Sequence, residues 1–472
     1  MLTGIRLQAL PTDIQRLTLS RWIGCDRVIW NAKCDEHRYM AAYARKFCPL
    51  GTYAPIDQAY SQFKDSDLTP WLSEVPSQIL RNSAVNWYRA YQRFFKKLGG
   101  RPRRKKRTDR GSVHLTRELF RFEKNESGEL KLFIGTKTND LGCLEFTAHR
   151  EFGIPNSIRI VREAGKWFVS FSYEDGKAKP EPAMPQFSDP QDRLEWLRAQ
   201  GREWLEGHVR GNDRGIVVPV QSGDDAYDFT PEQKTSLWKT QKKDKRLQKR
   251  LTRQDKGSKR RARTKLRLAR VRLKERNVRK DFCHKASRKI VDGAAPINVF
   301  ENLKLKNMVR RPKAVRDENG KFLPNGARAK AGLNRGLLSN GLGMVVDYAQ
   351  YKAEREGKIV LLIDPRNTSR ECASCGHVDS DSRRTQAKFE CTACGHRDNA
   401  DRNASIIIGK RAVDLIMDSG TELSERGILS KPKREDTGRG AEGKTEGAEV
   451  SSAHGEEASK REALQGFLRE AA

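Results

Sequence analysis

The chain has 472 residues, of which 36% are hydrophobic, so it is long enough for two to four domains with cores of their own. Its 93 lysines and arginines against 61 aspartates and glutamates give a net charge of +32, which predicts a polyanionic partner. Nucleic acid is favoured over a membrane surface, because the basic segments lack an aromatic and aliphatic face and no apolar run is long enough to span a bilayer.

Nine cysteines in a chain without an apolar leader over residues 1–10 predict a reducing compartment. We therefore expect a cytoplasmic protein. Four of the cysteines form two close pairs, and the other five are expected to be free packing residues: Cys25, Cys34, Cys48, Cys143 and Cys283.

The first hundred residues read as one strand followed by helices. GIRLQAL in residues 1–10 predicts the strand. Apolar residues at helical spacing predict one helix that begins after Pro11 and a second that runs from Val28 toward Met40. Apolar and aromatic residues also predict a third helix over residues 77–98, with basic residues on its exposed side. A Gly-Gly pair marks its end.

From about residue 112 the pattern changes to alternating apolar and polar residues, which predicts short antiparallel strands joined by tight turns. These strands and the N-terminal strand predict a small barrel of residues 1–10 and 111–175. The helices of residues 11–110 would be an insertion into that barrel.

Two basic stretches are candidates for phosphate contacts. RPRRKKR follows the third helix, and a long helical pair over residues 233–280, broken at residues 255–258, carries Lys or Arg at nearly every second or third position. A solvated loop or face is the alternative reading, but charge of one sign in a cationic chain favours nucleic acid. The residues expected to make these contacts are Arg101, Arg103, Arg104, Lys105, Lys106, Arg107, Lys242, Lys243, Lys245, Arg246, Lys249 and Arg250.

The second half of the chain predicts apolar strands that end in acidic residues. Asp213 lies in a strand, Glu301 follows the apolar run PINVF, and a long loop over residues 309–332 separates that run from a further helix. Beyond residue 417, large apolar residues are almost absent as far as residue 459, which predicts disorder.

Two CxxC pairs are the most specific motif in the chain. Cys372 and Cys375 form the first pair, Cys391 and Cys394 the second, and residues 376–390 separate them. Four thiolates leave no open coordination position, so the predicted ion is one structural Zn²⁺. In peptide-sized sites such an ion contributes roughly 10–16 kcal/mol to folding. Four ordinary buried cysteines are the alternative.

Three carboxylates could form a second metal site. Asp213, Glu301 and Asp401 are far apart in the sequence, but each lies on an apolar scaffold. Carboxylates are ligands that Mg²⁺ prefers, and two Mg²⁺ ions about 4 Å apart suit hydrolysis of a phosphodiester. Chemistry alone leaves this triad as one choice among many acidic residues.

Several motifs together resemble one family. VRGNDRGIVVPV, NVFENLKLKNM and NADRNAS, with the double CxxC just before the last, resemble the RuvC-like nuclease of the TnpB family (insertion-sequence OrfB) and its compact type V CRISPR relatives. The segments GIRLQALP, VPSQILRNSAVNWYRAYQRFFKK, GGRPRRKKR, REAGKWFVSF and DPRNTSRECASCGH also look like this family, so the similarity is nearly chain-wide.

The resemblance implies an α+β multidomain fold. Its parts would be a wedge-type β-barrel (1–10 and 111–175), a helical recognition lobe (11–110), a linker with an extra helix (176–206), an RNase H-like (RuvC) nuclease domain (207–363 and 399–417), a zinc-ribbon module for target nucleic acid (364–398) and a disordered tail (418–472).

The resemblance also implies an RNA-guided, Mg²⁺-dependent DNA endonuclease. Asp213, Glu301 and Asp401 would be catalytic and would hold two Mg²⁺ ions, and the four cysteines would hold Zn²⁺. The partners would be a guide RNA and double-stranded target DNA, in the cytoplasm of a prokaryote and close to its nucleoid. Base pairing would supply most of the specificity, aided by a short motif beside the target.

Three features depart from the family pattern. Asn212 stands where an aliphatic residue is usual, and strand alternation predicts that it points away from Asp213. Ile407 replaces a common Asn, and residues 187–205 look like an additional helix. None of these changes removes a carboxylate.

Two other functions stay open at this point: a guide-dependent DNA-binding repressor that does not cut, and a guide-independent transposase accessory or nucleic-acid-binding protein. The complete triad favours the nuclease. The sequence leaves open a transposon or CRISPR context, the guide, the target-adjacent motif, and whether a monomer or a homodimer works.

Overall fold

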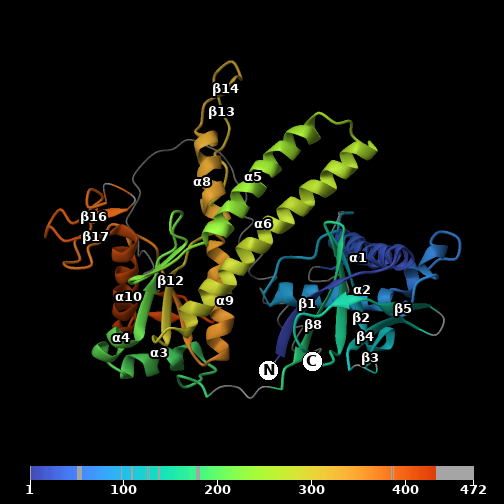
Figure 1. The fold of residues 1–472 in the computed structure, drawn as a ribbon, viewed down its shortest axis with the longest axis horizontal. Coiled ribbons are helices and arrows are strands. Elements are labelled where there is room, and N and C mark those ends of the chain that lie inside the picture. The colour runs from blue at the N-terminus through green and yellow to red at the C-terminus, as the bar shows by residue number, and fades with distance from the viewer. Residues whose placement is uncertain are drawn as a thin grey trace. The chain divides into compact units, whose positions relative to one another are not determined.

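A computed structural model of the protein describes residues 2–49, 56–96, 98–107, 110–124, 126, 128–136, 139–176, 181–383, 385 and 387–431. The chain divides into two compact units, one of residues 1–177 and one of residues 178–437. Both units mix helices and strands, as Figure 1 shows, so the mixed α/β class is confirmed. No helix within the described ranges combines the length and the apolar character needed to cross a membrane.

The first unit contains two antiparallel sheets over a shared apolar core. A five-stranded sheet has the order β2-β7-β8-β1-β6, and a three-stranded sheet has the order β3-β4-β5. The strands are β1 (Leu2–Ala9), β2 (Gly111–Thr116), β3 (Phe120–Lys124), β4 (Leu130–Gly135), β5 (Asp140–Leu144), β6 (Phe146–Thr147), β7 (Ser157–Glu163) and β8 (Lys166–Glu174). β1 therefore pairs with strands more than 130 residues later in the chain, and whether the sheets form the wedge barrel stays a prediction.

In the described residues between β1 and β2 there are two α-helices, where the sequence predicted three. α1 (Asp13–Phe47) is continuous, and α2 (Ser77–Phe95) packs against it in the same core. The expected break before Val28 is wrong, because one glycine inside a helix costs only about 1 kcal/mol relative to alanine. Trp22, Ile23 and Ile29 are buried on both sides of Gly24, so tertiary packing holds the helix together.

The second unit is built on a parallel sheet in the order β15-β12-β9. Its strands are β9 (Val209–Asn212), β12 (Ile297–Glu301) and β15 (Ile359–Ile363). Asp213 extends the sheet by an antiparallel bridge to Gln221 in β10 (Val220–Ser222), and β10 pairs with β11 (Asp225–Tyr227). All residues of β12 and β15 are buried, as expected for strands of a sheet that is covered on both faces.

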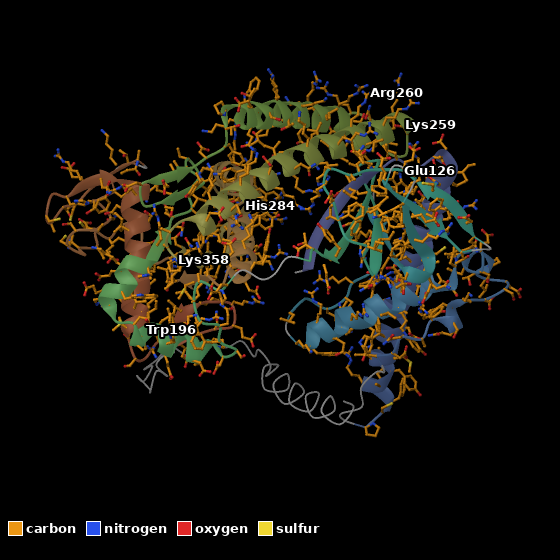
Figure 2. All side chains as sticks on the ribbon, turned by 60° about the horizontal axis from the view of Figure 1, so that its bottom comes forward. Glu126, Trp196, Lys259, Arg260, His284 and Lys358 are labelled. Carbon is orange, nitrogen blue, oxygen red and sulfur yellow. The ribbon has the colours of Figure 1, made fainter. Side chains whose placement is uncertain are left out.

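Helices cover the two faces of this sheet. On one face, α10 (Ala400–Met417), α3 (Pro190–Ala199) and α4 (Arg202–His208) pack on Ile297 and Val299. On the other face, α6 (Lys259–Asp292) and α9 (Leu342–Arg355) pack on Phe300. The predicted extra helix before β9 is thus two helices whose leucines join the core. Trp196 of α3 is labelled in Figure 2.

Two helical projections leave the second unit (Figure 1). α5 (Pro231–Thr252) and the first half of α6 form the predicted basic hairpin around a thin seam of Leu247, Leu268 and Val271. The predicted long loop is wrong in part, because residues 309–332 contain a small hairpin, β13 (Val315–Arg316) and β14 (Phe322–Leu323), and the start of α8 (Ala327–Ser339). The short helix α7 (Leu305–Met308) precedes the hairpin.

The described part of the predicted disordered tail is folded. β18 (Glu422–Leu423) pairs with β19 (Leu429–Ser430), and both leucines are buried in the core of the second unit. Arg198 of α3 donates hydrogen bonds to the carbonyls of Ile416, Asp418 and Thr421. The expectation of disorder is therefore wrong for residues 418–431, and residues 432–472 lie outside the described residues.

Candidate active site and metal centre

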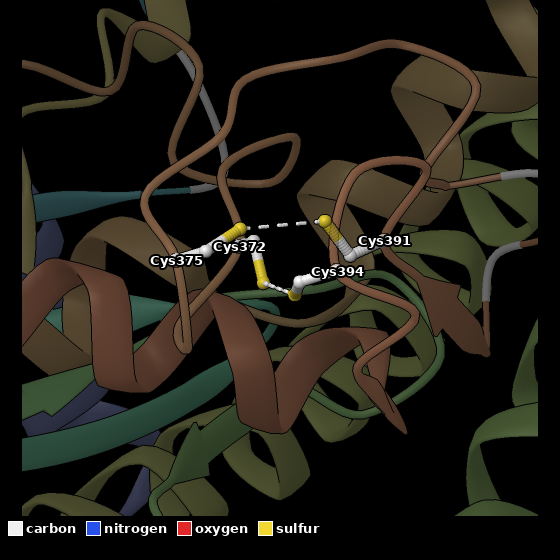
Figure 3. Close-up of side chains that lie close together, drawn as sticks. All are labelled: Cys372, Cys375, Cys391 and Cys394. Carbon is white, nitrogen blue, oxygen red and sulfur yellow. Dashed lines mark hydrogen bonds between the residues drawn. The ribbon is translucent and has the colours of Figure 1, made fainter.

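The four cysteines of the two CxxC motifs come together in space (Figure 3). Their sulfur atoms all lie within 4.8 Å of one another. The Sγ atoms of Cys372 and Cys394 are 3.7 Å apart, and those of Cys375 and Cys391 are 3.6 Å apart. Zn–S bonds of about 2.3 Å in a tetrahedron place sulfurs about 3.8 Å apart, so this group fits Zn²⁺.

The two halves of the cluster share one backbone motif. In the first half, Gly376 donates its N–H to the carbonyl of Cys372 at 2.9 Å. In the second half, Gly395 donates to Cys391 at 3.0 Å. Both glycines have positive φ, +74° and +69°, which an L side chain rarely adopts, so glycine is needed to turn each loop.

The cysteine cluster is attached directly to α10. β16 (Lys388–Glu390) and β17 (Arg397–Asn399) form a hairpin around the second CxxC, and β17 runs straight into the helix. Asn403, fully buried in α10, donates to the carbonyl of Glu371 at 2.7 Å and accepts from the N–H of Ala373 at 2.9 Å. The first cysteine loop is therefore fixed to the helix that carries Asp401.

Asp213 and Glu301 lie at the same end of neighbouring parallel strands. In the register of β9 and β12, Phe300 lies opposite Asn212. The residues that follow them, Glu301 and Asp213, therefore lie next to each other where the two strands end. Alternation directs both carboxylates toward the α10 face, since Val299, two residues before Glu301, packs there. Asn212 points the other way, as predicted, and donates to Asn298 and to the carbonyl of Val299.

Asp401 approaches the same place from the start of α10. It is the second residue of the helix, and its N–H is capped by the side chain of Asn399 at 2.9 Å. An added Cβ on Gly215, two residues after Asp213, would lie 3.7 Å from Oδ2 of Asp401. The three sequence-predicted carboxylates thus gather at one edge of the sheet.

Burial raises the pKa of two of these carboxylates, Asp213 and Glu301. The pKa of Asp213 rises to about 7, first because the side chain is buried and then because Glu301 and Asp401 are nearby negative charges. Burial also raises the pKa of Glu301, opposed by a hydrogen bond of 2.5 Å from the hydroxyl of Thr368. Buried carboxylates that repel each other fit a site for cations.

Within the described part of the chain, the four cysteines are the group of three or more metal-ligating side chains whose ligand atoms lie within 4.8 Å of one another. The three carboxylates are not part of such a group, so the binding of Mg²⁺ here stays a prediction.

Two arginines that the sequence analysis did not single out also lie at the site. Arg383, in the loop between the CxxC pairs, makes an ion pair of 2.9 Å with Asp401. Arg214 is buried beside Asp213 and donates to the carbonyls of Glu301 and Leu342. The sequence shows Arg214 directly after Asp213. Arg383 is one of many arginines, and no nearby motif distinguishes it from the others.

The predicted phosphate contacts lie at two surfaces. All twelve side chains are exposed, but in the first stretch Lys105 pairs with Asp26 at 3.2 Å and Arg104 with Asp35 at 3.1 Å. In α5 the basic side chains line the outside of the hairpin. Lys259 and Arg260 mark its tip in Figure 2. Arg246 and Arg250 line a hollow of about 540 Å³ there.

Fold and site define a two-unit α/β protein with a four-cysteine cluster fixed to the helix that carries Asp401, one of three neighbouring carboxylates. Three family models match: a Cas12f1-like TNB domain at residues 343–408, a "Probable transposase" (OrfB_IS605) at 219–311, and a helix-turn-helix domain at 1–33. Residues 2–33 form β1 and the first part of α1, without a turn between two helices.

Similar proteins cover most of the chain. "Putative RNA-guided DNA endonuclease InsQ" of Escherichia coli (strain K12) is 28% identical, and the match covers 86% of this chain and 90% of the length of that protein. A "Putative RNA-guided DNA endonuclease" of Streptomyces pristinaespiralis is 27% identical over 78% and 79%. A solved Cas12f1–sgRNA–target DNA complex covers 84% of this chain and 83% of its own at 12% identity, with a TM-score of 0.49. The resemblance to the insertion-sequence OrfB family is confirmed.

Proposed function

We propose that the protein is an RNA-guided DNA endonuclease whose catalytic residues are Asp213, Glu301 and Asp401. The observation that carries this proposal is the arrangement of three carboxylates at one edge of one sheet: half-buried Asp213 just after β9, and buried Glu301 and Asp401 in β12 and α10. The naming of the two curated relatives as RNA-guided DNA endonucleases supports the substrate and the guide.

The chemistry proposed is hydrolysis of a phosphodiester. Two Mg²⁺ ions held by the triad would supply an activated water and stabilise the leaving oxygen. Thr368 holds the carboxylate of Glu301 in place through its hydroxyl, and Arg214 ties the ends of β9 and β12 together. Arg383 neutralises part of the charge on Asp401, and its loop belongs to the cysteine module.

The cysteine module acts as a structural part of this site in the proposal. Zn²⁺ bound by the four thiolates would fix both cysteine loops, and Asn403 transmits that order to α10. Lys410, further along α10, also donates to the carbonyl of Ala373 at 2.6 Å. The position of Asp401 would therefore depend on the bound zinc.

The basic hairpin of α5 and α6 is the proposed contact for guide and target backbones. Residues 231–292 contain 25 lysines and arginines but 6 acidic residues, so the hairpin attracts a polyanion along its whole length. Contacts of this kind position a nucleic acid without reading its sequence, which agrees with recognition through base pairing.

Cleavage by single-residue variants tests the proposal. With a co-purified RNA and matching DNA, wild-type protein should cut in the presence of Mg²⁺, and Asp213→Ala and Glu301→Ala should abolish cutting while RNA binding is retained. A protein that binds its RNA and the matching DNA but does not cut would instead be the guided repressor. Cutting that survives removal of the RNA would point to the guide-independent alternative.

A further inference from the structure

Residues 302–341 form a projection next to the candidate site that the proposed function leaves unused. We call it the 302–341 arm. It leaves the sheet directly after Glu301, carries the β13–β14 hairpin, and returns through α8 to α9. Figure 1 shows the hairpin at the far end of α8.

The base of the arm is fixed to the candidate site. Asn340, at the end of α8, donates to the carbonyl of Gly215 at 3.0 Å, and Gly215 lies against Asp401. Arg214 donates to the carbonyl of Leu342, the first residue of α9, at 2.8 Å. The arm is therefore anchored at the edge of the sheet where the three carboxylates meet.

The far end of the arm carries an exposed aromatic ring. Phe322 is 62% exposed, although a phenyl ring normally lies in a core. Its cross-strand partner Arg316 places the guanidinium 4.4 Å from the centre of the ring. Val315 and Leu323 beside them are also exposed, at 47% and 44%. This tip offers an apolar stacking surface together with positive charge.

Charge of one sign runs from the tip to the base. The arm has ten lysines and arginines and two acidic residues, Asp317 and Glu318. Where α8 meets α6, a cavity of about 700 Å³ has a strongly basic lining. The charged residues of that lining are Glu275, Arg279, Arg311, Arg328, Lys330 and Arg335. An acidic polymer is thus the partner that complements the whole arm.

An aromatic ring among cations distinguishes between kinds of acidic polymer. A duplex presents its phosphates but keeps its bases stacked inside, so it would satisfy the arginines and leave Phe322 uncovered. A single strand offers phosphates and unstacked bases together, and bases stack on exposed aromatic rings. The exposed ring and the cations of the arm, together with its position beside the three carboxylates, therefore favour a single strand that extends from the arm to the candidate site.

We propose that the 302–341 arm is a binding surface for single-stranded DNA, with a base stacked on Phe322 and phosphates held by the cations toward α6. The surface would present the strand to Asp213, Glu301 and Asp401. The choice of DNA rests on the proposed function, since the strand is taken to be the one that this site cuts.

Binding without added Mg²⁺ tests this surface separately from cutting. The probes are a labelled oligo-dT strand of about 20 nucleotides and a duplex of the same length, measured by fluorescence anisotropy with the full-length protein and its RNA. Phe322→Ala should weaken binding of the strand about fivefold or more, because one stacked base is lost, and should leave duplex binding unchanged. Phe322→Trp should bind the strand within about twofold of wild type, since the larger ring stacks at least as well.

The control is Met417→Ala, which removes another exposed apolar side chain, at the end of α10, and should change neither affinity. The proposal is overturned if Phe322→Ala binds the strand like wild type, or if it loses strand and duplex equally, as a general basic contact or a protein-docking face would predict. A protein that needs Phe322 for strand binding but never cuts matched DNA would refute the proposed function and leave this surface intact.

Discussion

At the scale of single residues, the candidate site opposes folding. The carboxyl group of Asp213 is largely desolvated, and Glu301 and Asp401 add negative charge beside it, so ionising Asp213 is unfavourable in the folded protein. Partly compensating contacts exist, such as Arg383 to Asp401 and Thr368 to Glu301. A site that stores repulsion in this way binds cations well, because each cation relieves it.

Replacing Asp213 by Asn should stabilise the protein when no divalent ion is present. The folded-state pKa of Asp213 is about 7 and its ordinary value is 3.8. Between these values the folded protein keeps a proton that the unfolded chain has lost, so stability falls as pH rises through this window. At pH 8 the penalty is complete, and Asp213→Asn should raise the free energy of unfolding by about 1–3 kcal/mol in urea titrations.

Two comparisons make that measurement specific. Glu195→Gln removes an exposed acid on α3 and should leave stability unchanged at both pH 5 and pH 8. Mg²⁺ should raise the Tm of wild type more than that of Asp213→Asn. An Asn variant no more stable than wild type at pH 8 would mean that Asp213 carries no buried charge.

At the scale of elements, one close crossing sets the distance between Asp213 and Asp401. Gly211 of β9 lies directly against α10, where a Cβ would come within 2.0 Å of the carbonyl of Ser405 and 2.5 Å of the N–H of Gly409. Only a pair of glycines allows a strand and a helix to approach this closely. The crossing joins the two elements that carry the outer members of the triad.

Gly211→Ala should therefore separate β9 from α10. The added methyl has no space, so we expect a loss of at least about 2 kcal/mol in the free energy of unfolding, measured by chemical denaturation. Gly207→Ala is the matched control, because nothing lies within 4 Å of its Cβ position in α4. There alanine should be neutral or stabilising by up to about 1 kcal/mol. Equal effects of the two substitutions would refute the role of the crossing.

The cysteine module should affect the carboxylate site through α10. Cys391→Ser should remove the bound zinc, measured by atomic emission, and lower both the Tm and the rate of cutting, because Asn403 then holds a disordered loop. Cys48→Ser, in the first unit, should retain zinc and activity. A Cys391→Ser protein that has lost zinc but keeps wild-type Tm and cutting would show that the two sites are independent.

At the scale of the whole molecule, features with strong local signals could be predicted from the sequence. The spacing of the cysteines indicated their cluster, and alternation along β9 placed Asn212 and Asp213 on opposite faces. The basic hairpin was visible as a charge run of one sign. The triad itself needed the resemblance to a family, because acidic residues are too common for chemistry alone to select three.

Features that depend on tertiary contacts were missed. Gly24 does not end α1, because buried residues on both sides hold the helix. Residues 418–431 are polar on average, but two leucines and the hydrogen bonds from Arg198 fix them to the core. Arg383 reaches Asp401 only after the cysteine loops have folded, so its place in the site has no signature in the sequence.

The central claim is that a bound RNA selects the DNA that this site cuts. The most direct measurement is to sequence the RNA that co-purifies with the protein, change its target-pairing segment, and map the cuts in DNA that carries the old and the new match. The account predicts that the cut moves to the new match and is absent in Glu301→Ala. Cutting that stays at the old sequence, or that ignores the RNA, would contradict it.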